Sequence, residues 1–367
     1  MSKDKLIGVG IIGAGFARST QMPAFRACAG ARLAAVASAR RESAERAARE
    51  FDIPVVGGDW REVIERADVD LVCITTPPVF HREMTLAALD AGKAVLCEKP
   101  TAMSAAESDE MRRRARASGL LALVDHELRF VPARRRAREL VAAGEIGRVR
   151  HAAVTFRADS RAGRGRAWDW WSDAAAGGGA LGAIGSHAVD SLRWLAGAEV
   201  SEVFCQLATH VGELPEAATG GPRRVTTDDA AHLLLRLAAG PAVAESATAS
   251  VALSFVEAGE PLHRVEIFGE QGALLLDGAG LWRATPGGRS WERVEVESAP
   301  LAEGMRDSEW SRGFTVFARE IVAALAAGRA AVEGAATFED GHRVQLVLDA
   351  ARRSHETGGR QTMSAER

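Results

Sequence analysis

Lysine is rare in this sequence, and one lysine stands where a proton-transferring group would be useful. Only four of the 46 Lys and Arg residues are lysines, namely Lys3, Lys5, Lys93 and Lys99. Arginine stays protonated at neutral pH, whereas a desolvated lysine can lose its proton. Solvated roles suffice for the first three, because two lie in a polar N-terminal stretch and one follows Gly92. Lys99 ends an apolar run before Pro100, and it is the predicted general acid or base.

A glycine turn after the first apolar run is typical of a dinucleotide-binding site. Gly13 allows a tight turn, and Gly15 lets a pyrophosphate approach the backbone amides of the helix expected to follow. Phe16 and Ala17 are predicted to bind the cofactor with them. Arg18 occupies the third small position of the pattern, so either Ala17 supplies the close strand–helix packing or Arg18 points outward, onto a phosphate. A glycine turn without a ligand is the alternative.

The end of the second apolar run favours NADP(H). A site for NAD(H) usually has an acidic residue there, which binds the ribose 2′-hydroxyl. This chain instead has Ser38, Arg40 and Arg41, and a hydroxyl with two guanidinium groups would bind a 2′-phosphate by charge-assisted hydrogen bonds. The alternative is that the two arginines only begin a solvated helix, and NAD(H) then remains possible.

The first 125 residues alternate short apolar runs with amphipathic stretches. This alternation predicts βαβ units and a parallel sheet, that is, an α/β Rossmann domain over residues 1–125. Asp59 with Glu62, and Ser104 with Glu107, have the spacing of helix capping boxes. The expected strands are Leu6–Ile12, Arg32–Ala37, Val55–Val56, Leu71–Thr75, Ala94–Glu98 and Leu120–Val124, and the expected helices are Ser43–Phe51, Trp60–Arg66, His81–Ala91 and Ala105–Ala117.

The pattern changes after about Leu128. A helix at Pro132–Ala143 is followed by longer strand-like runs, which predict an α+β domain over residues 126–357 with a largely antiparallel, open sheet. Residues 213–224 are expected to form a surface loop and residues 358–367 a frayed tail. A further possibility is that a C-terminal helix packs back on the first domain. The expected strands are Val149–Arg157, Val200–His210, His232–Leu237, Val243–Leu253, Arg264–Phe268 and Ala273–Leu276, and the last helices are Phe314–Ala327 and Phe338–Ser354.

Composition excludes several classes of protein. The 367 residues are 47% hydrophobic and 26% charged, which predicts a folded chain of two domains, and no apolar run is long enough to span a membrane. The net charge of −3 predicts no binding to nucleic acid. Four cysteines without CxxC spacing predict neither zinc nor disulfides, and they favour a reducing cytoplasm. No signal peptide is expected, and the absence of tyrosine excludes a phenolic acid in the mechanism.

Two further segments lie where parallel strands should end. They are TTPPVFH at residues 75–81 and CEKP at residues 97–100. Together with HELRF at 126–130, GGGALGAIGSHAVD at 177–190 and TFEDG at 337–341, they resemble the Gfo/Idh/MocA oxidoreductases over nearly the whole chain. Open α/β sheets place ligands at such strand ends, so we predict that Thr75, Pro77, His81, Glu98 and Lys99 bind the cofactor.

The resemblance assigns further roles. It places Lys99 beside the nicotinamide and the reacting oxygen of the substrate, implies a cis Lys99–Pro100 bond, and makes His187 an acid or base. Ala183 stands where relatives often carry Asp, which puts the substrate class in doubt, and Asp190 matches another acidic position of the signature.

Each of these positions also has a structural interpretation. His187 could be a hydrogen-bonded histidine of a domain interface, and Asp190 either orients it or is a plain helix acid. Candidate substrate contacts are His126, Arg129, Trp168 and Asp190, although a packed strand end or loop would also explain them. The arginines at 112–114 and 134–136 are interpreted as solvated helix faces.

The function predicted is transfer of hydride between NADP(H) or NAD(H) and a sugar, polyol or related small hydroxy or keto compound, without a metal. One alternative is a glycoside-cleaving enzyme that uses NAD with no net redox change, and another is a nucleotide-sensing regulator without catalysis. A homodimer or homotetramer is expected through the C-terminal sheet, because its strands carry apolar residues at both alternating sets of positions.

Overall fold

The computed structural model describes residues 6–363 and divides the chain into two compact units. The first contains the chain up to Val131 together with Ser298–His342, and the second contains Pro132–Glu297 with the chain from Arg343 onward. The first unit is therefore discontinuous, whereas a single boundary after residue 125 was expected. Lys3 and Lys5, and the last four residues of the tail, lie outside the described residues.

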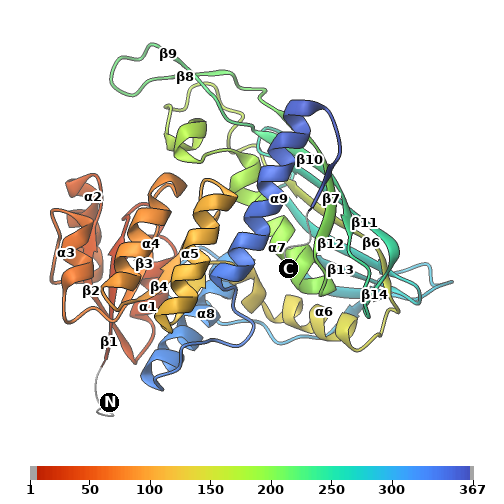
Figure 1. The fold of residues 1–367 in the computed structure, drawn as a ribbon, viewed down its shortest axis with the longest axis horizontal. Coiled ribbons are helices and arrows are strands. Elements are labelled where there is room, and N and C mark those ends of the chain that lie inside the picture. The colour runs from red at the N-terminus through yellow and green to blue at the C-terminus, as the bar shows by residue number, and fades with distance from the viewer. Residues whose placement is uncertain (1–5, 364–367) are drawn as a thin grey trace. The chain divides into compact units, whose positions relative to one another are not determined.

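The first unit is built on a five-stranded parallel sheet (Figure 1). Its order β2-β1-β3-β4-β5 confirms the Rossmann-type arrangement predicted from the alternating runs. The expected short strand at Val55–Val56 contributes only one bridge, between Val36 and Val56. The strands are β1 (Ile7–Ile12), β2 (Ala31–Ala37), β3 (Leu71–Ile74), β4 (Ala94–Cys97) and β5 (Ala122–Val124).

Helices cover both faces of this sheet, because successive strand residues point to opposite sides. Val9 and Ile11 face α1 (Gln21–Arg26), α2 (Arg41–Phe51) and α8 (Glu309–Ala326), whereas Val72 and Ile74 face the other three helices. Asp59 and Ser104, the first residues of the two capping boxes, each accept a backbone N–H at the start of their helix. The other three helices are α3 (Trp60–Glu65), α4 (His81–Asp90) and α5 (Ala105–Ser118).

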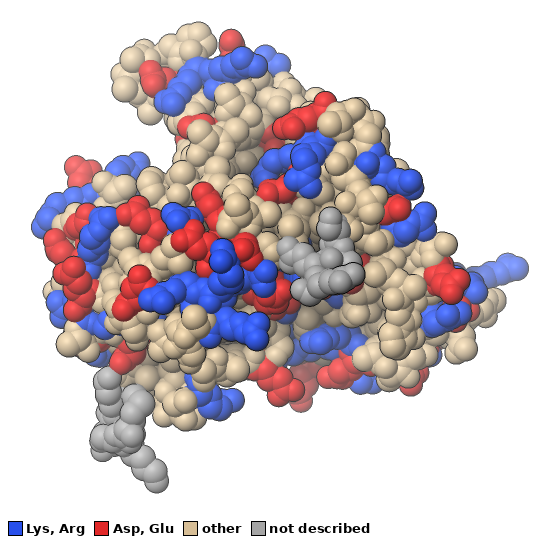
Figure 2. All heavy atoms as spheres, in the orientation of Figure 1, with Lys and Arg blue, Asp and Glu red and all other residues tan. Residues whose placement is uncertain are grey.

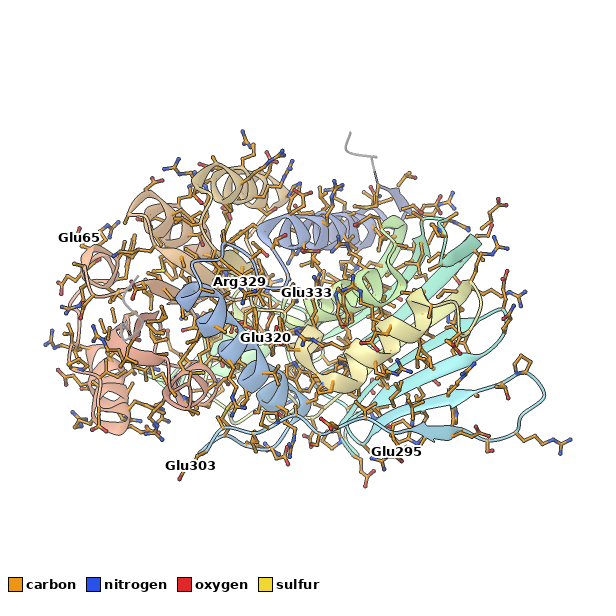
Figure 3. The ribbon with its side chains drawn as sticks, turned by 90° about the horizontal axis from the view of Figure 1, so that it is seen from below. Glu65, Glu295, Glu303, Glu320, Arg329 and Glu333 are labelled. Carbon is orange, nitrogen blue, oxygen red and sulfur yellow. The ribbon has the colours of Figure 1, made fainter. Side chains whose placement is uncertain are left out.

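Helix α8 comes late in the chain but completes the core of the first unit. Phe317 stacks on Phe130 with ring centroids 4.1 Å apart, and Phe314 meets Phe25 edge to face at 5.8 Å. These four rings are fully buried. Figure 3 shows Glu320 on α8. The core of this unit therefore depends on residues more than 170 positions downstream of Val131.

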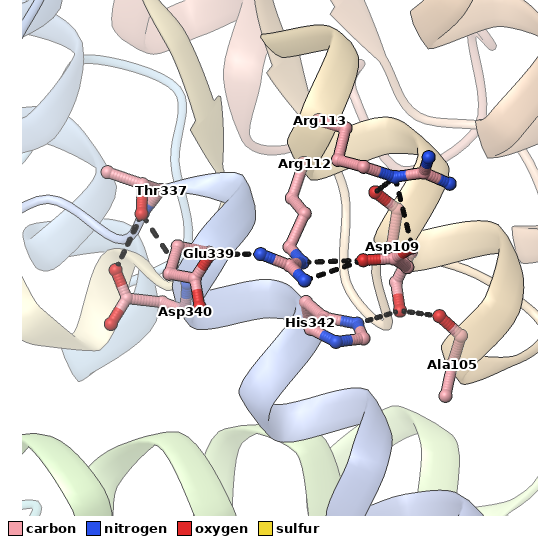
Figure 4. A network of polar contacts seen from close by, with 9 residues as sticks. Ala105, Asp109, Arg112, Arg113, Thr337, Glu339, Asp340 and His342 are labelled. Carbon is pink, nitrogen blue, oxygen red and sulfur yellow. Dashed lines mark hydrogen bonds and ion pairs between the residues drawn. The ribbon is translucent and has the colours of Figure 1, made fainter. Parts of the chain in front are cut away.

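A buried polar network joins α5 to the first turns of α9 (Phe338–Thr357) (Figure 4). The Ser108 hydroxyl lies 2.8 Å from Nδ1 of His342 and donates to the Ala105 carbonyl. Arg112 bridges Asp109 and Glu339. Arg112 was expected on a solvated face, and its ion pairs instead tie two helices together.

The second unit contains a mixed, mostly antiparallel sheet of nine strands. Helices α6 (Pro132–Ala142) and α7 (Ser186–Ala196), with the later turns of α9, pack on one face in a single apolar cluster. Arg134 is buried in α6, contrary to the expected solvated face, and it donates to Ser191. The order is β15-β14-β13-β12-β6-β11-β10-β7-β16, formed by β6 (Val149–Arg157), β7 (Val200–Ala208), β10 (Ala230–Leu237), β11 (Val243–Ser254), β12 (Leu262–Gly269), β13 (Ala273–Asp277), β14 (Gly280–Ala284), β15 (Glu292–Val294) and β16 (Gln361–Thr362).

The outward face of this sheet is mixed in character, not uniformly apolar as expected. One row across five paired strands reads Phe204, Leu234, Ser250, Ala153 and Glu266. Leu234 is 63% exposed, and Phe204 beside it is exposed as well. The row continues to Leu275 and Trp282, so apolar side chains of this face lie on strands at both sides of the polar ones.

Two segments that were predicted to lack regular structure form strands. The expected surface loop at 213–224 contains a hairpin of β8 (Glu213–Pro215) and β9 (Pro222–Arg224). The tail predicted to fray instead forms β16, which pairs with β7. The Ser354 hydroxyl donates to the carbonyl of Gly359 and holds the turn before this strand.

The surface carries many ion pairs. On the face shown in Figure 2, basic and acidic side chains are interspersed. Surface ion pairs include Arg82 with Glu110 and Arg61 with Glu83. Across residues 6–363, no helix is both long and apolar enough to cross a membrane.

Candidate functional site

The glycine turn is held by the end of strand β3. Gly13 has a φ of 103°, and a Cβ atom built there would lie 2.6 Å from the carbonyl oxygen of Thr75. The Thr75 hydroxyl donates to the carbonyls of Ile12 and Gly13. Only glycine fits this conformation and this contact. Thr75 therefore fixes the turn that it was predicted to accompany in cofactor binding.

The backbone is uncovered at Gly15, just after this turn. A Cβ atom on Gly15 would meet nothing within 4 Å, so its backbone is open to a ligand. Ala17 is fully buried and supplies the close packing, while Arg18 points outward and pairs with Glu50 at 3.0 Å. Residues 14–20 form turns and α1 begins only at Gln21, later than the expected helix start. Phe16 is exposed beside this opening.

The basic residues after β2 are exposed. Arg40 is the residue before α2, and the side chain of Arg41 at its first position pairs with Glu45 one turn on, at 2.9 Å. Ser38 is half-buried between the strand and these arginines. The two guanidinium groups thus follow the carboxyl end of β2, where a Rossmann fold binds the ribose of its dinucleotide.

His81 connects the ends of two neighbouring strands. Its ring nitrogens lie 2.8 Å from the Thr76 carbonyl and 3.0 Å from the Pro100 carbonyl. Burial lowers the pKa of His81 to about 4, although the backbone carbonyls oppose the shift. A neutral ring has a single N–H, so His81 donates to only one of these two carbonyls. Pro77, earlier in the same segment, is half-buried. The Lys99–Pro100 bond is cis, as the resemblance implied.

Three buried carboxyl groups surround the backbone next to Lys99. Burial raises the pKa of Glu98, which the positive charge of Lys99 opposes. Burial also raises the pKa of Asp125 well above its usual range, and the neighbouring Glu98 raises it further. The pKa of Glu127 rises to about 8 for the same two reasons. The half-buried Lys99 is therefore placed among carboxyl groups that do not all ionise at neutral pH.

Gln21 joins two of these carboxyl groups. Its Nε2 donates to Oδ2 of Asp125 at 2.8 Å and to Oε1 of Glu98 at 3.3 Å. Gln21 is fully buried at the start of α1. Neither Gln21 nor Asp125 was predicted as a site residue. The only available signal was that Asp125 ends the strand before the HELRF segment.

The predicted substrate contacts in the first unit are buried. His126 and Arg129 are both less than 6% exposed, and Arg129 donates to Asp340 at 3.0 Å. Asp340 also accepts from the backbone and hydroxyl of Thr337. Arg129 therefore links η2 (Glu127–Phe130) to the start of α9, and the substrate role predicted for both residues remains a hypothesis.

His187 lies in the second unit at the second position of α7. A π-helical segment, η5 (Leu181–Gly185), runs directly into this helix, and Ala183 lies within it. Both His187 and Asp190 are buried on α7. The hydroxyl of Ser186 donates to the carbonyl of Gly182 at 2.7 Å, which holds the junction.

Sterically required glycines and one buried acid fix the segment before His187. A Cβ atom on Gly178 would lie 2.0 Å from the carbonyl oxygen of Trp171, and one on Gly179 would lie 2.5 Å from Asp228. The Asp228 carboxylate accepts the N–H of Leu181 at 2.7 Å. Asp228 was missed in the sequence, because nothing in its neighbourhood marks it as the partner of a segment 47 residues earlier.

Trp168 belongs to a different part of the second unit. Its Nε1 donates to the carbonyl of Arg224, and the guanidinium of Arg223 stacks 3.4 Å from its ring centroid. The ring packs on a small apolar cluster of Val211, Leu214 and Val225. Trp168 is therefore engaged by the β8–β9 hairpin.

The structure groups the predicted residues into two sets. Gly13, Thr75, His81, Glu98 and Lys99 lie at the carboxyl ends of β1, β3 and β4 in the first unit, whereas His187 and Asp190 lie on α7 in the second. Among the residues described, no three His, Cys, Asp or Glu side chains are arranged to hold a metal ion.

A parallel sheet with an open glycine turn and ligand-facing strand ends defines a dinucleotide-binding protein, and the second unit adds a mixed, mostly antiparallel sheet. Residues 7–126 match the oxidoreductase family with an NAD-binding Rossmann fold, and residues 134–275 match the GFO/IDH/MocA C-terminal domain. The chain belongs to the Gfo/Idh/MocA oxidoreductase family.

Individual relatives agree with this assignment. An uncharacterized oxidoreductase of Synechocystis is 32% identical over 277 residues, which are 75% of this chain and 73% of that protein. The crystal structure of an oxidoreductase domain protein from Kribbella flavida is similar with a TM-score of 0.86 and 31% identity, covering 98% of this chain and all of that one. Levoglucosan dehydrogenase in complex with NADH and levoglucosan matches with a TM-score of 0.83 and 27% identity over 98% of this chain and 99% of that one.

Proposed function

We propose that this protein transfers hydride between a nicotinamide cofactor and a CH–OH group of a sugar, polyol or related small compound. The observation that carries this proposal is Lys99 at the end of β4, in the same strand-end set as the open glycine turn. The similarity to levoglucosan dehydrogenase supports a sugar-like substrate. When bound, the nicotinamide supplies the hydride acceptor or donor.

The residues of this chain would handle the proton. In the oxidation direction, the hydroxyl proton of the substrate passes to the Lys99 amine as the C–H hydride leaves, and reduction reverses both transfers. An amine has a neutral form that can take up this proton, whereas a guanidinium stays protonated. His187 would assist the proton transfer, with Asp190 one turn further along α7. Ala183 removes a carboxylate that many relatives have, so the substrate contacts differ from theirs.

For the cofactor we propose a preference for NADP(H) over NAD(H). The support is Arg40 and Arg41, whose exposed guanidinium groups follow β2 where an acid would otherwise bind the ribose. The neighbour with bound NADH establishes a nicotinamide cofactor for that protein, and NAD(H) is the competing choice here.

Titration followed by turnover tests the proposed reaction. NAD(H) and NADP(H) are each titrated by isothermal calorimetry, and the tighter nucleotide is then used with a panel of sugars, polyols and their keto forms. We expect reduced nicotinamide absorbance to change with at least one of them. Bound nucleotide with product formation but no absorbance change would identify a non-redox reaction, and binding without turnover would identify a sensor.

We also propose a homo-oligomer formed through the nine-stranded sheet, and a cytoplasmic location. The exposed Leu234 and Phe204 support the interface, and the four cysteines, all buried and free, support a reducing compartment. Light scattering at micromolar concentration should give a multiple of 38.9 kDa. Leu234→Asp should lower that mass, and a wild-type mass of one chain would disprove the oligomer.

A further inference from the structure

The acid pair, Glu98 and Asp125, has a geometry that the proposed hydride transfer does not explain. The two carboxyl groups are both buried, and a single donor group bridges them. Two ionised carboxylates so close together in a buried region would repel each other, which favours the state in which one of them keeps a proton. The Nε2 of Gln21 donates to one oxygen of each group and thereby holds the two carboxyl groups close together.

The titratable groups around the acid pair supply only one positive charge to balance it. The thiols of Cys73 and Cys97 have pKa values raised by burial and stay neutral. His126 adjoins Asp125 in the chain, and Glu127 carries a pKa of about 8, raised by burial and by Glu98. Glu309, at the start of α8, adds a further negative influence on Glu127. Lys99 is the positive charge that acts on both Glu98 and Glu127.

We propose that Glu98 and Asp125 share one proton and together hold a single negative charge against Lys99. One ionised and one protonated acid balance one ammonium group in a buried region, where an unbalanced charge is costly. Glu98 and Asp125 are then positioning residues, since they act on the reaction through Lys99. This inference rests on the proposed function for its catalytic meaning, but the shared proton itself does not.

A charge that is shared predicts a distinctive mutational pattern. In Asp125→Asn the remaining Glu98 carries the charge alone, and in Glu98→Gln Asp125 carries it, so either variant preserves one negative charge. Removing both groups removes the charge. A neighbouring negative charge favours the protonated form of a lysine, so only the double variant should lower the Lys99 pKa strongly.

The scarcity of lysine makes this pattern directly measurable. Reductive methylation with ¹³C-formaldehyde labels only four lysines and the N-terminus, and Lys99→Arg identifies the Lys99 resonance. The titration midpoint of that resonance is measured by NMR in the wild type, in each single variant and in the double variant. We expect shifts below about 0.3 pH units for the single variants and a fall of about one unit or more for the double variant.

Two results would overturn the proposal. If each single variant lowers the midpoint by about half the effect of the double variant, both acids were ionised and no proton was shared. If the double variant leaves the midpoint unchanged, the acid pair holds no charge against Lys99. Glu110→Gln is the control, because that carboxylate pairs with Arg82 on the surface.

An infrared measurement keeps the proposal testable if the double variant does not fold. The wild-type protein at pH 7 should show the infrared absorption of protonated carboxylic acids. In Asp125→Asn this absorption should fall by the amount that one such group contributes. Equal absorption in the two proteins would contradict the shared proton. Neither measurement needs a substrate, so a failed substrate screen would count against the proposed function alone.

Discussion

The segments that carry Lys99 and His187 are both fixed in place, but by different means. Around Lys99 the contacts are made by titratable side chains: His81 holds the Pro100 carbonyl, and three buried carboxyl groups lie nearby. The segment before His187 is fixed mainly by shape, through Gly178 and Gly179, with Asp228 binding one amide. The first segment should therefore respond to charge and pH, and the second to side-chain volume.

The largest effect should come from changing the amine itself. Lys99→Arg keeps the positive charge but removes a group that can give up a proton, so turnover should fall by on the order of a hundredfold or more, with nearly normal nucleotide binding. Lys99→Met should lose turnover similarly without loss of fold. Steady-state kinetics and calorimetric titration measure the two properties. Near-normal turnover of the arginine variant would remove Lys99 from the chemistry.

Adding one methyl group should disturb the His187 segment more than its surroundings. Gly178→Ala places a Cβ atom against the Trp171 carbonyl, so we expect a loss of about 2 to 3 kcal/mol in the free energy of unfolding. The matched control is Gly163→Ala, where a Cβ atom meets nothing within 4 Å. Thermal unfolding followed by circular dichroism compares the two. Equal melting temperatures would show that shape does not hold this segment.

Arg40 and Arg41, which follow β2, should recognise the 2′-phosphate of NADP(H). Replacing both Arg40 and Arg41 by Ala should weaken NADP(H) binding by on the order of 2 kcal/mol, or about thirtyfold, and NAD(H) binding much less. Calorimetric titration of both nucleotides measures the difference. An equal loss for both would mean that these arginines do not recognise the phosphate.

The pH response of His81 should be smaller but specific to the Lys99 segment. Its pKa is about 4 in the folded protein and 6.5 when unfolded, so its contribution to stability is complete above pH 6.5 and is lost as the pH falls toward 4. The destabilisation caused by His81→Gln should therefore shrink by about 1 to 2 kcal/mol between pH 7 and pH 5. Urea unfolding at both pH values tests this, and a constant difference would contradict a neutral, buried ring.

The parts of the molecule that the sequence predicted are those with local signals. Alternating apolar runs located all five strands of the parallel sheet, and the glycine turn and the CEKP segment lie at its carboxyl edge. Gln21, Asp125 and Asp228 were missed, because each acts on a segment far away in the chain. The outward face of the larger sheet was misjudged because periodicity does not reveal which set of residues a helix covers. The β8–β9 hairpin was missed for lack of apolar alternation.

Helix α8 has a consequence for how the chain is made. Phe130 and Phe25 find their aromatic partners only in residues 314–317, which leave the ribosome long after Val131. At typical elongation rates of about 5 to 20 residues per second, the first unit waits about 10 to 40 s for its last helix. During that interval the intervening 166 residues, Pro132–Glu297, are synthesised, but the second unit still lacks the later turns of α9 that complete its core. The nascent dinucleotide-binding region, although it is synthesised first, therefore exposes until then the apolar surface that α8 covers.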